Sequence, residues 1–152
     1  MTRVCLLGAE DSNIRGDLLV YETARSALQP YDLSEPFENS VAVETVSLGA
    51  AISLLNDLDW YLARVADAVL VLEPSVSEEE WLSRSLARAV RNDEVAPAGT
   101  DEYLKIYGLE GRSLVEPMFV TRRDGSVPDY DLRDVDDTVV VRVTESEFGG
   151  PT

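Results

Sequence analysis

The chain has no histidine and only one cysteine among its 152 residues. Histidine is the commonest general base and metal ligand, so its absence excludes a Ser-His-Asp or Cys-His catalytic arrangement built from this chain alone. A single cysteine excludes an internal disulfide and an all-cysteine zinc site. Cys5 stands between Val4 and Leu6, which predicts a small buried core residue. The alternative, a reactive thiol, would require a nearby cation.

Lysine is almost absent too, because 12 of the 13 basic residues are arginine and the one lysine is Lys105. Against 29 acidic residues this gives a net charge of −16. Residues 1–76 hold 12 acidic and 4 basic residues, and residues 77–152 hold 17 and 9, so each half carries −8. The excess acid is therefore a property of the whole surface and not of a tail.

An even acidic surface with little lysine resembles the cytoplasmic proteins of extreme halophilic archaea. There carboxylates hold water and cations, and concentrated salt screens their mutual repulsion. The alternative is a nucleic-acid mimic that occupies a basic partner. No large basic patch can be read from the sequence, so we do not expect naked nucleic acid as a partner.

No apolar run is long enough and free enough of charge to predict a membrane span. The longest, residues 48–72, is interrupted by four charged residues: Asp57, Asp59, Arg64 and Asp67. The first residues lack the apolar segment and cleavage site of a signal peptide. We therefore expect a cytoplasmic protein that does not contact a membrane.

The hydropathy pattern predicts an α+β fold. Strands are expected at residues 3–8, 41–46, 103–107, 113–121 and 138–144, and Pro117 marks the fourth as an edge strand or a bulged one. Helices are expected at residues 13–29, 48–72 and 77–91, the last opened by a capping box of Ser77 and Glu80. About three helices would cover one face of a mostly antiparallel sheet of about five strands. Residues 1–146 would form a single domain and residues 147–152 a flexible tail.

Several paired carboxylates suggest a metal site in the loop at residues 127–137. The candidate ligands are Asp129, Asp131, Asp134 and Asp136, because hard cations such as Mg²⁺ bind converging oxygen atoms. The loop lacks the residue order of an EF-hand, and clusters of this kind arise by chance in so acidic a chain. The alternative is a solvated loop, and we expect no metal. We expect no other cofactor either, because the turn at residues 8–13 lacks a nucleotide-binding motif.

Arg84, Arg88 and Arg91 are spaced to form one cationic stripe on the helix at residues 77–91. Such a stripe would suit an acidic neighbour or a phosphate-bearing ligand. The alternative is local: Glu80 pairs with Arg84, and the cations stabilise the carboxyl end of the helix.

Trp60 is the residue most suggestive of a binding surface. On a helix over residues 48–72 it shares the polar stripe with Asp57, Arg64 and Asp67. A tryptophan on the polar face either packs under another element of its own chain or anchors a partner, because tryptophan is enriched at interface hot spots.

Two stretches, VETVSLGAAISLLNDLDWYL and TVVVRVTESEFGG, resemble small uncharacterised acidic proteins of halophilic archaea. That resemblance implies a habitat and no activity. Gly149-Gly150 also resembles the end of ubiquitin-like modifiers, although Pro151 and Thr152 follow it.

These observations favour a non-enzymatic interaction or accessory module of a salt-adapted organism. Its partner would be another protein, or a second copy in a homodimer. The alternative is a small carboxylate-using, metal-dependent enzyme or a small-molecule binding protein. That alternative needs a pocket in which a carboxyl group with a raised pKa lies beside an arginine such as Arg122 or Arg133.

Overall fold

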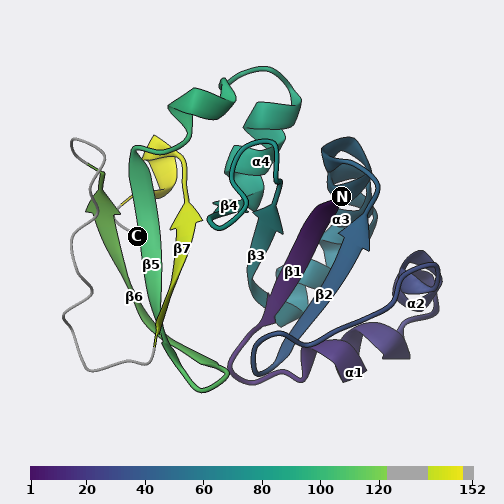
Figure 1. The fold of residues 1–152 in the computed structure, drawn as a ribbon. Helices are drawn as coiled ribbons and strands as arrows, with labels where there is room; N and C mark the ends of the chain where they lie inside the picture. Colours follow the sequence, from purple (N-terminus) through teal and green to yellow (C-terminus); the bar gives the residue numbers. More distant parts are fainter. Residues whose placement is uncertain (123–136, 149–152) are drawn as a thin grey trace.

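The computed structural model describes residues 1–122 and 137–148 as an α+β fold built on one mixed sheet (Figure 1). The strands are β1 (Thr2–Gly8), β2 (Ser40–Thr45), β3 (Ala66–Leu72), β4 (Trp81–Ser83), β5 (Tyr103–Glu110), β6 (Ser113–Thr121) and β7 (Asp137–Arg142). The helices are α1 (Ile14–Val20), α2 (Glu22–Leu28), α3 (Leu48–Val65) and α4 (Arg84–Arg91), and two 3₁₀ helices cover Pro97–Gly99 and Glu145–Glu147.

The seven described strands lie in the order β2-β1-β3-β4-β7-β5-β6. Every pairing is antiparallel except that of β4 with β7, so the prediction of a mostly antiparallel sheet is confirmed. β6 lies at one edge, as Pro117 predicts, and its pairing with β5 shifts register between Ile106 and Gly108.

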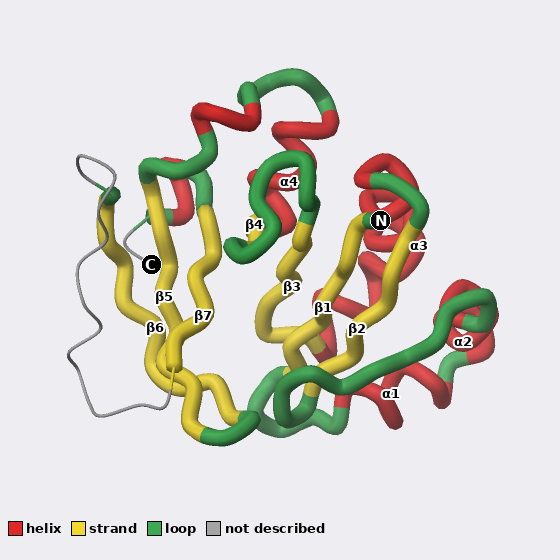
Figure 2. The backbone as a smooth tube through the Cα atoms, viewed as in Figure 1, coloured by secondary structure: helices red, strands yellow, loops and turns green. Residues whose placement is uncertain are grey.

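The helices cover only half of this sheet. They gather behind β2, β1, β3 and β4, whereas β7, β5 and β6 stand apart from them (Figure 2). Alternate residues of the first four strands, such as Val4, Val43 and Leu82, pack against helix residues such as Leu55 and Leu58. The expected single layer of helices on one sheet face is therefore correct for one half of the sheet and wrong for the other.

The opposite face of the helix-covered half is buried by the remaining strands. Cys5, Leu70 and Trp81 from this half form one core cluster with Tyr107 and Val141 of β5 and β7. At the bottom of Figure 1 the loop before β2 meets the β5–β6 hairpin, where the Glu38 amide donates to the Arg112 carbonyl at 2.8 Å. The sheet curls so that its two halves bury each other's apolar face.

Three predicted helices differ from the observed ones. The helix expected at residues 13–29 is two helices, broken where Tyr21 adopts an extended backbone. The helix expected at residues 48–72 ends at Val65, because residues 66–72 pair with β1. The helix expected at residues 77–91 begins at Arg84, capped by Ser83 and not by Ser77, whose hydroxyl caps a turn before β4. A short buried apolar run fits a strand as well as a helix, so periodicity alone could not separate them.

Cys5 is fully buried in β1, as predicted. Burial raises the pKa of its thiol to about 12, against the smaller lowering effects of Arg3 and Ser40. At the other end of the described chain, Phe148 packs on Tyr103, with ring centroids 5.1 Å apart. Gly149 and Gly150 lie outside the described residues. None of the described helices is both long and apolar enough to cross a membrane.

Asn39 fixes the start of α1 and gives a test of the fold. Its backbone is left-handed (φ 54°), and its side chain accepts from the Ile14 amide at 2.9 Å. Its amide group donates to the carbonyls of Ala9 (3.1 Å) and Ser12 (2.9 Å). We expect Asn39→Ala to lower the free energy of unfolding by about 2–4 kcal/mol, since three hydrogen bonds and a favourable φ are lost. Urea denaturation measures this.

The matched variant is Asn39→Gly, which permits the positive φ but lacks the side chain. It should recover only the smaller part of the lost stability. Recovery to the full stability of the parent protein would show that the three side-chain hydrogen bonds contribute nothing.

Candidate functional site

Trp60 is half exposed on α3, with 52% of its surface accessible, and it belongs to a cluster of three aromatic rings. Tyr21 approaches it nearly edge-on, with ring centroids 5.9 Å apart, and Tyr61 lies 5.1 Å away. The guanidinium carbon of Arg64 stands 3.5 Å from the centre of the Trp60 ring. Exposed Val20 adjoins Tyr21 in sequence. We call Val20, Tyr21, Trp60, Tyr61 and Arg64 the aromatic surface.

The local backbone explains how this surface forms. Tyr21 ends α1 and begins α2, and its extended conformation turns the ring out of the helical path toward α3. Tyr61 is half buried against the helix-covered core, so it anchors the cluster. Arg64 donates to the Trp60 carbonyl at 2.6 Å, which holds its guanidinium over the indole. These contacts hold a large, partly exposed apolar area in one arrangement.

The structure brings together only part of the predicted Trp60 set. Arg64 stacks on Trp60, and Asp57 is exposed on the same helix. Asp67 does not belong to the helical stripe, because α3 ends at Val65 and Asp67 is a residue of β3. Sequence reasoning missed Tyr21 and Tyr61. Tyr61 adjoins Trp60 in sequence, but Tyr21 reaches it only through the break between α1 and α2.

The arginine stripe of α4 is largely engaged with α3. Arg84 donates to the Asp59 carboxylate at 2.7 Å and to the Leu55 carbonyl at 3.2 Å. A methyl group added at Gly49 would lie 2.9 Å from Nε of Arg91, so that side chain crosses the first turn of α3. Arg88 is exposed. The predicted stripe therefore serves mainly to hold two helices together.

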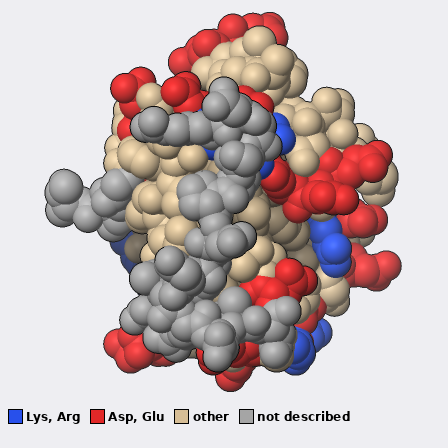
Figure 3. All heavy atoms as spheres, turned by 60° about the vertical axis from the view of Figure 1, so that its left-hand side comes forward, with Lys and Arg blue, Asp and Glu red and all other residues tan. Residues whose placement is uncertain are grey.

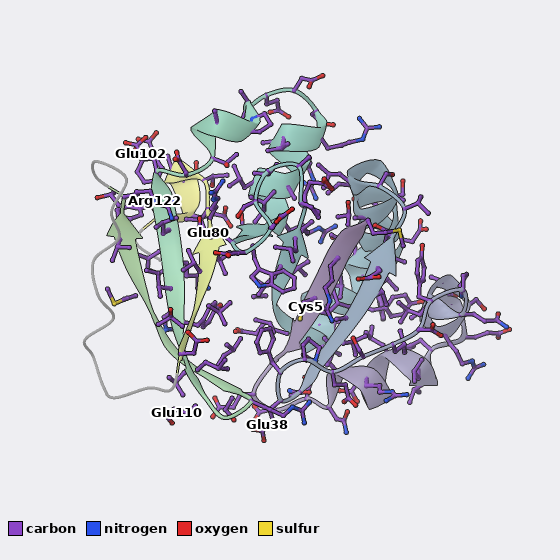
Figure 4. All side chains as sticks on the ribbon, viewed as in Figure 1. Cys5, Glu38, Glu80, Glu102, Glu110 and Arg122 are labelled. Carbon is purple, nitrogen blue, oxygen red and sulfur yellow. The ribbon has the colours of Figure 1, made fainter. Side chains whose placement is uncertain are left out.

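The expected pair of Glu80 with Arg84 does not form. Glu80, just before β4, instead accepts from Arg122 at 2.5 Å, and both residues are labelled in Figure 4. It also accepts from Nε of Arg142 at 2.8 Å. Arg142 also donates to Thr100 at 2.9 Å. Burial acts to raise the pKa of Glu80, but the hydrogen bonds and charges of the two arginines outweigh it and lower that pKa. This is the opposite of the raised pKa that a general acid beside Arg122 would need.

The predicted metal-binding loop lies outside the described residues. This applies to its four candidate ligands, Asp129, Asp131, Asp134 and Asp136, and to Arg133. Within residues 1–122 and 137–148, no group of three or more Asp, Glu or Cys side chains is placed to hold a metal ion. The acidic side chains are spread over the visible face of the molecule in Figure 3, with few basic ones between them.

A hollow of about 340 Å³ opens between the end of α3, β3, the start of α4 and the strands β5 and β7. Its lining combines apolar residues such as Leu70, Val141 and Val143 with charged ones. Asp67 and Arg84, two of the predicted interaction residues, both line it. This space is distinct from the aromatic surface, none of whose residues line it.

A family model described as a family of unknown function (DUF5804) matches residues 2–109. Neither the curated proteins nor the solved structures include a match to the chain.

The ion pairs of Glu80 with Arg122 and Arg142 predict how the stability of the fold depends on pH. We expect Glu80→Gln to lower the free energy of unfolding at neutral pH by about 2 kcal/mol, since two arginines lose their shared negative charge and one of its two acceptor oxygens becomes an amide donor. Because the folded pKa of Glu80 is lowered, its stabilisation is fully present above the unfolded value of about 4.3 and disappears as the pH falls through the folded value. Denaturant unfolding of both proteins from neutral to acid pH measures the difference.

The control is Glu79→Gln, which removes the same charge from an exposed neighbour. It should change stability by less than about 0.5 kcal/mol at every pH. Equal effects of the two substitutions would mean that the Glu80 pairs do not stabilise the fold.

Proposed function

The chain belongs to the DUF5804 family, whose function is unknown, and we propose that it is a non-enzymatic interaction module that binds a partner protein through the aromatic surface. The observation that carries the proposal is the exposed Trp60, held by Tyr21, Tyr61 and Arg64. Aromatic and arginine side chains of this kind supply most of the binding energy at protein interfaces. Their fixed positions reduce the entropy lost on binding.

The charge of the chain indicates what kind of partner fits. Because salt screens charges that are far apart, the charge of −16 acts mainly at contact, where the acidic rims of two copies would repel each other and a basic rim would pair with this one. A heterologous partner whose basic rim surrounds an apolar contact is therefore favoured over a homodimer.

We also propose that the protein works in concentrated salt. The proposal rests on the even acidic surface and the near absence of lysine. In dilute buffer the carboxylates repel each other over long range, and added KCl screens this repulsion. The melting temperature should accordingly rise with the KCl concentration, so binding is best measured in concentrated KCl.

Trp60→Ala tests the proposed surface. Tagged protein is used to capture its partner in concentrated KCl from a lysate of its own organism, with mass spectrometry and light scattering on the eluate. We expect a stoichiometric basic partner whose recovery falls at least tenfold in the variant, because a buried hot-spot tryptophan contributes about 2 kcal/mol or more. The unchanged melting temperature of the variant would exclude unfolding as the cause.

The matched control is Val46→Ala, which trims another exposed apolar side chain, on the loop between β2 and α3. It should capture the partner as well as the parent protein does. Equal capture by Trp60→Ala, or a clean homodimer without any partner, would contradict the proposal.

A further inference from the structure

The hollow beside β3 continues toward a second one of about 330 Å³ near the β5–β6 hairpin. Asp67 and Tyr107 line both, so they stand where the two spaces adjoin. Their combined volume lies in the range of small-molecule sites in proteins. The walls come from both halves of the sheet, and neither half forms the site alone.

Tyr107 carries a buried hydroxyl without a hydrogen-bond partner among the described residues, in a side chain that is only 6% exposed. An unpaired hydroxyl in such a place costs stability, so it is normally satisfied by water or by a ligand. Tyr107 lines both hollows, but its hydroxyl oxygen has almost no accessible surface, so a molecule bound there becomes its partner only if a neighbouring side chain moves aside.

Two charged groups of the hollow are also unpaired among the residues that the structure describes. The ammonium of Lys105 lies 5.0 Å from the centre of the Tyr107 ring and makes no ion pair there. Asp67 is exposed, and its carboxylate has no hydrogen-bond or ion-pair partner among the described residues either. In a chain with one lysine, an unpaired and half-buried ammonium among 29 acidic residues is notable.

The remaining charged groups of the first hollow are already satisfied. Arg84 is paired with Asp59 at 2.7 Å. Glu147 accepts from the Ser83 hydroxyl at 2.7 Å and from the Thr144 amide at 3.0 Å. Three groups of the first hollow therefore remain to recognise a ligand: the ammonium of Lys105, the hydroxyl of Tyr107 and the carboxylate of Asp67. In the second hollow, Glu38 accepts from the Ser113 hydroxyl and Glu10 is exposed.

Irregular strand pairing sets two of these residues in place. Leu7 pairs with Ala68 and Gly8 with Ala66, so Asp67 is the extra residue of a β-bulge in β3. The register between β5 and β6 shifts opposite Tyr107. Bulges redirect side chains and occur often beside binding sites.

We propose that this hollow binds a small zwitterion, an amino acid with an aliphatic side chain. Its carboxylate would be held by Lys105, and by the Tyr107 hydroxyl once the side chains covering that hydroxyl move, and its ammonium group by Asp67. Leu70, Val141 and Val143 would contact the aliphatic part. A simple anion fits less well, because it would lie beside the Asp67 carboxylate, whose charge it leaves unpaired. The proposal is independent of the aromatic surface.

Isothermal titration calorimetry with L-leucine in concentrated KCl tests it. We expect saturable binding that weakens about three- to tenfold in Tyr107→Phe and about tenfold or more in Lys105→Met and Asp67→Asn. Isocaproate, which lacks the ammonium group, and isoamylamine, which lacks the carboxylate, should each bind at least tenfold more weakly than L-leucine.

Tyr107→Phe removes only an unpaired hydroxyl, so its melting temperature should not fall and its effect on binding can be assigned to the ligand. Asp11→Asn, an exposed substitution outside the hollow, should bind like the parent protein. No heat with L-leucine, equal binding of isocaproate or isoamylamine, or binding unchanged in all three hollow variants would overturn the proposal. Absence of binding would leave water as the partner of Tyr107.

Discussion

The two halves of the sheet are joined where Glu80 meets Arg122 and Arg142, directly before the three residues of β4. β4 pairs with β3 on one side and with β7 on the other, by two residue pairs each. So short a strand contributes few backbone hydrogen bonds. The carboxylate of Glu80 adds charge-assisted hydrogen bonds with Arg122, which directly follows β6, and with Arg142, the last residue of β7. The second core cluster and the hollow beside Tyr107 are both formed by residues of the two halves, so both depend on the halves staying together.

The sequence predicted the fold class, the mostly antiparallel sheet and the burial of Cys5, because these follow from local hydropathy. It predicted too few strands and helices. Residues 66–72 are an apolar run whose pairing with β1 decides the outcome, and residues 81–83 are too short a strand to show a period. The partner of Glu80 could not be predicted either. Arg84 is four residues away in sequence, but Arg122 and Arg142 reach Glu80 only when the sheet curls.

The candidate sites could likewise be predicted only where residues close in sequence determine them. Trp60 was identified from its place on a polar helical face, and it is exposed. Its ring partner Tyr21 comes from a different helix, and the hollow that contains Lys105 and Tyr107 is lined from both halves of the sheet. The matched family range ends at Leu109, within β5, so β6, β7 and both arginine partners of Glu80 lie beyond it. Within the matched range lie the aromatic surface, Asp67, Lys105 and Tyr107.

From the shared core cluster and the ion pairs of Glu80 we infer that the strands β5 to β7 and the helix-covered strands form one cooperative body. Amide hydrogen exchange, read strand by strand in concentrated KCl, tests this directly because it measures the free energy of opening at each site. If the claim holds, the slowest amides of β5 and β7 open with the same free energy as those of β1 and β3. If the β5 and β7 amides exchange through an opening of much lower free energy while β1 and β3 stay protected, the two halves do not form one body. Neither the second core cluster nor the hollow would then persist as described.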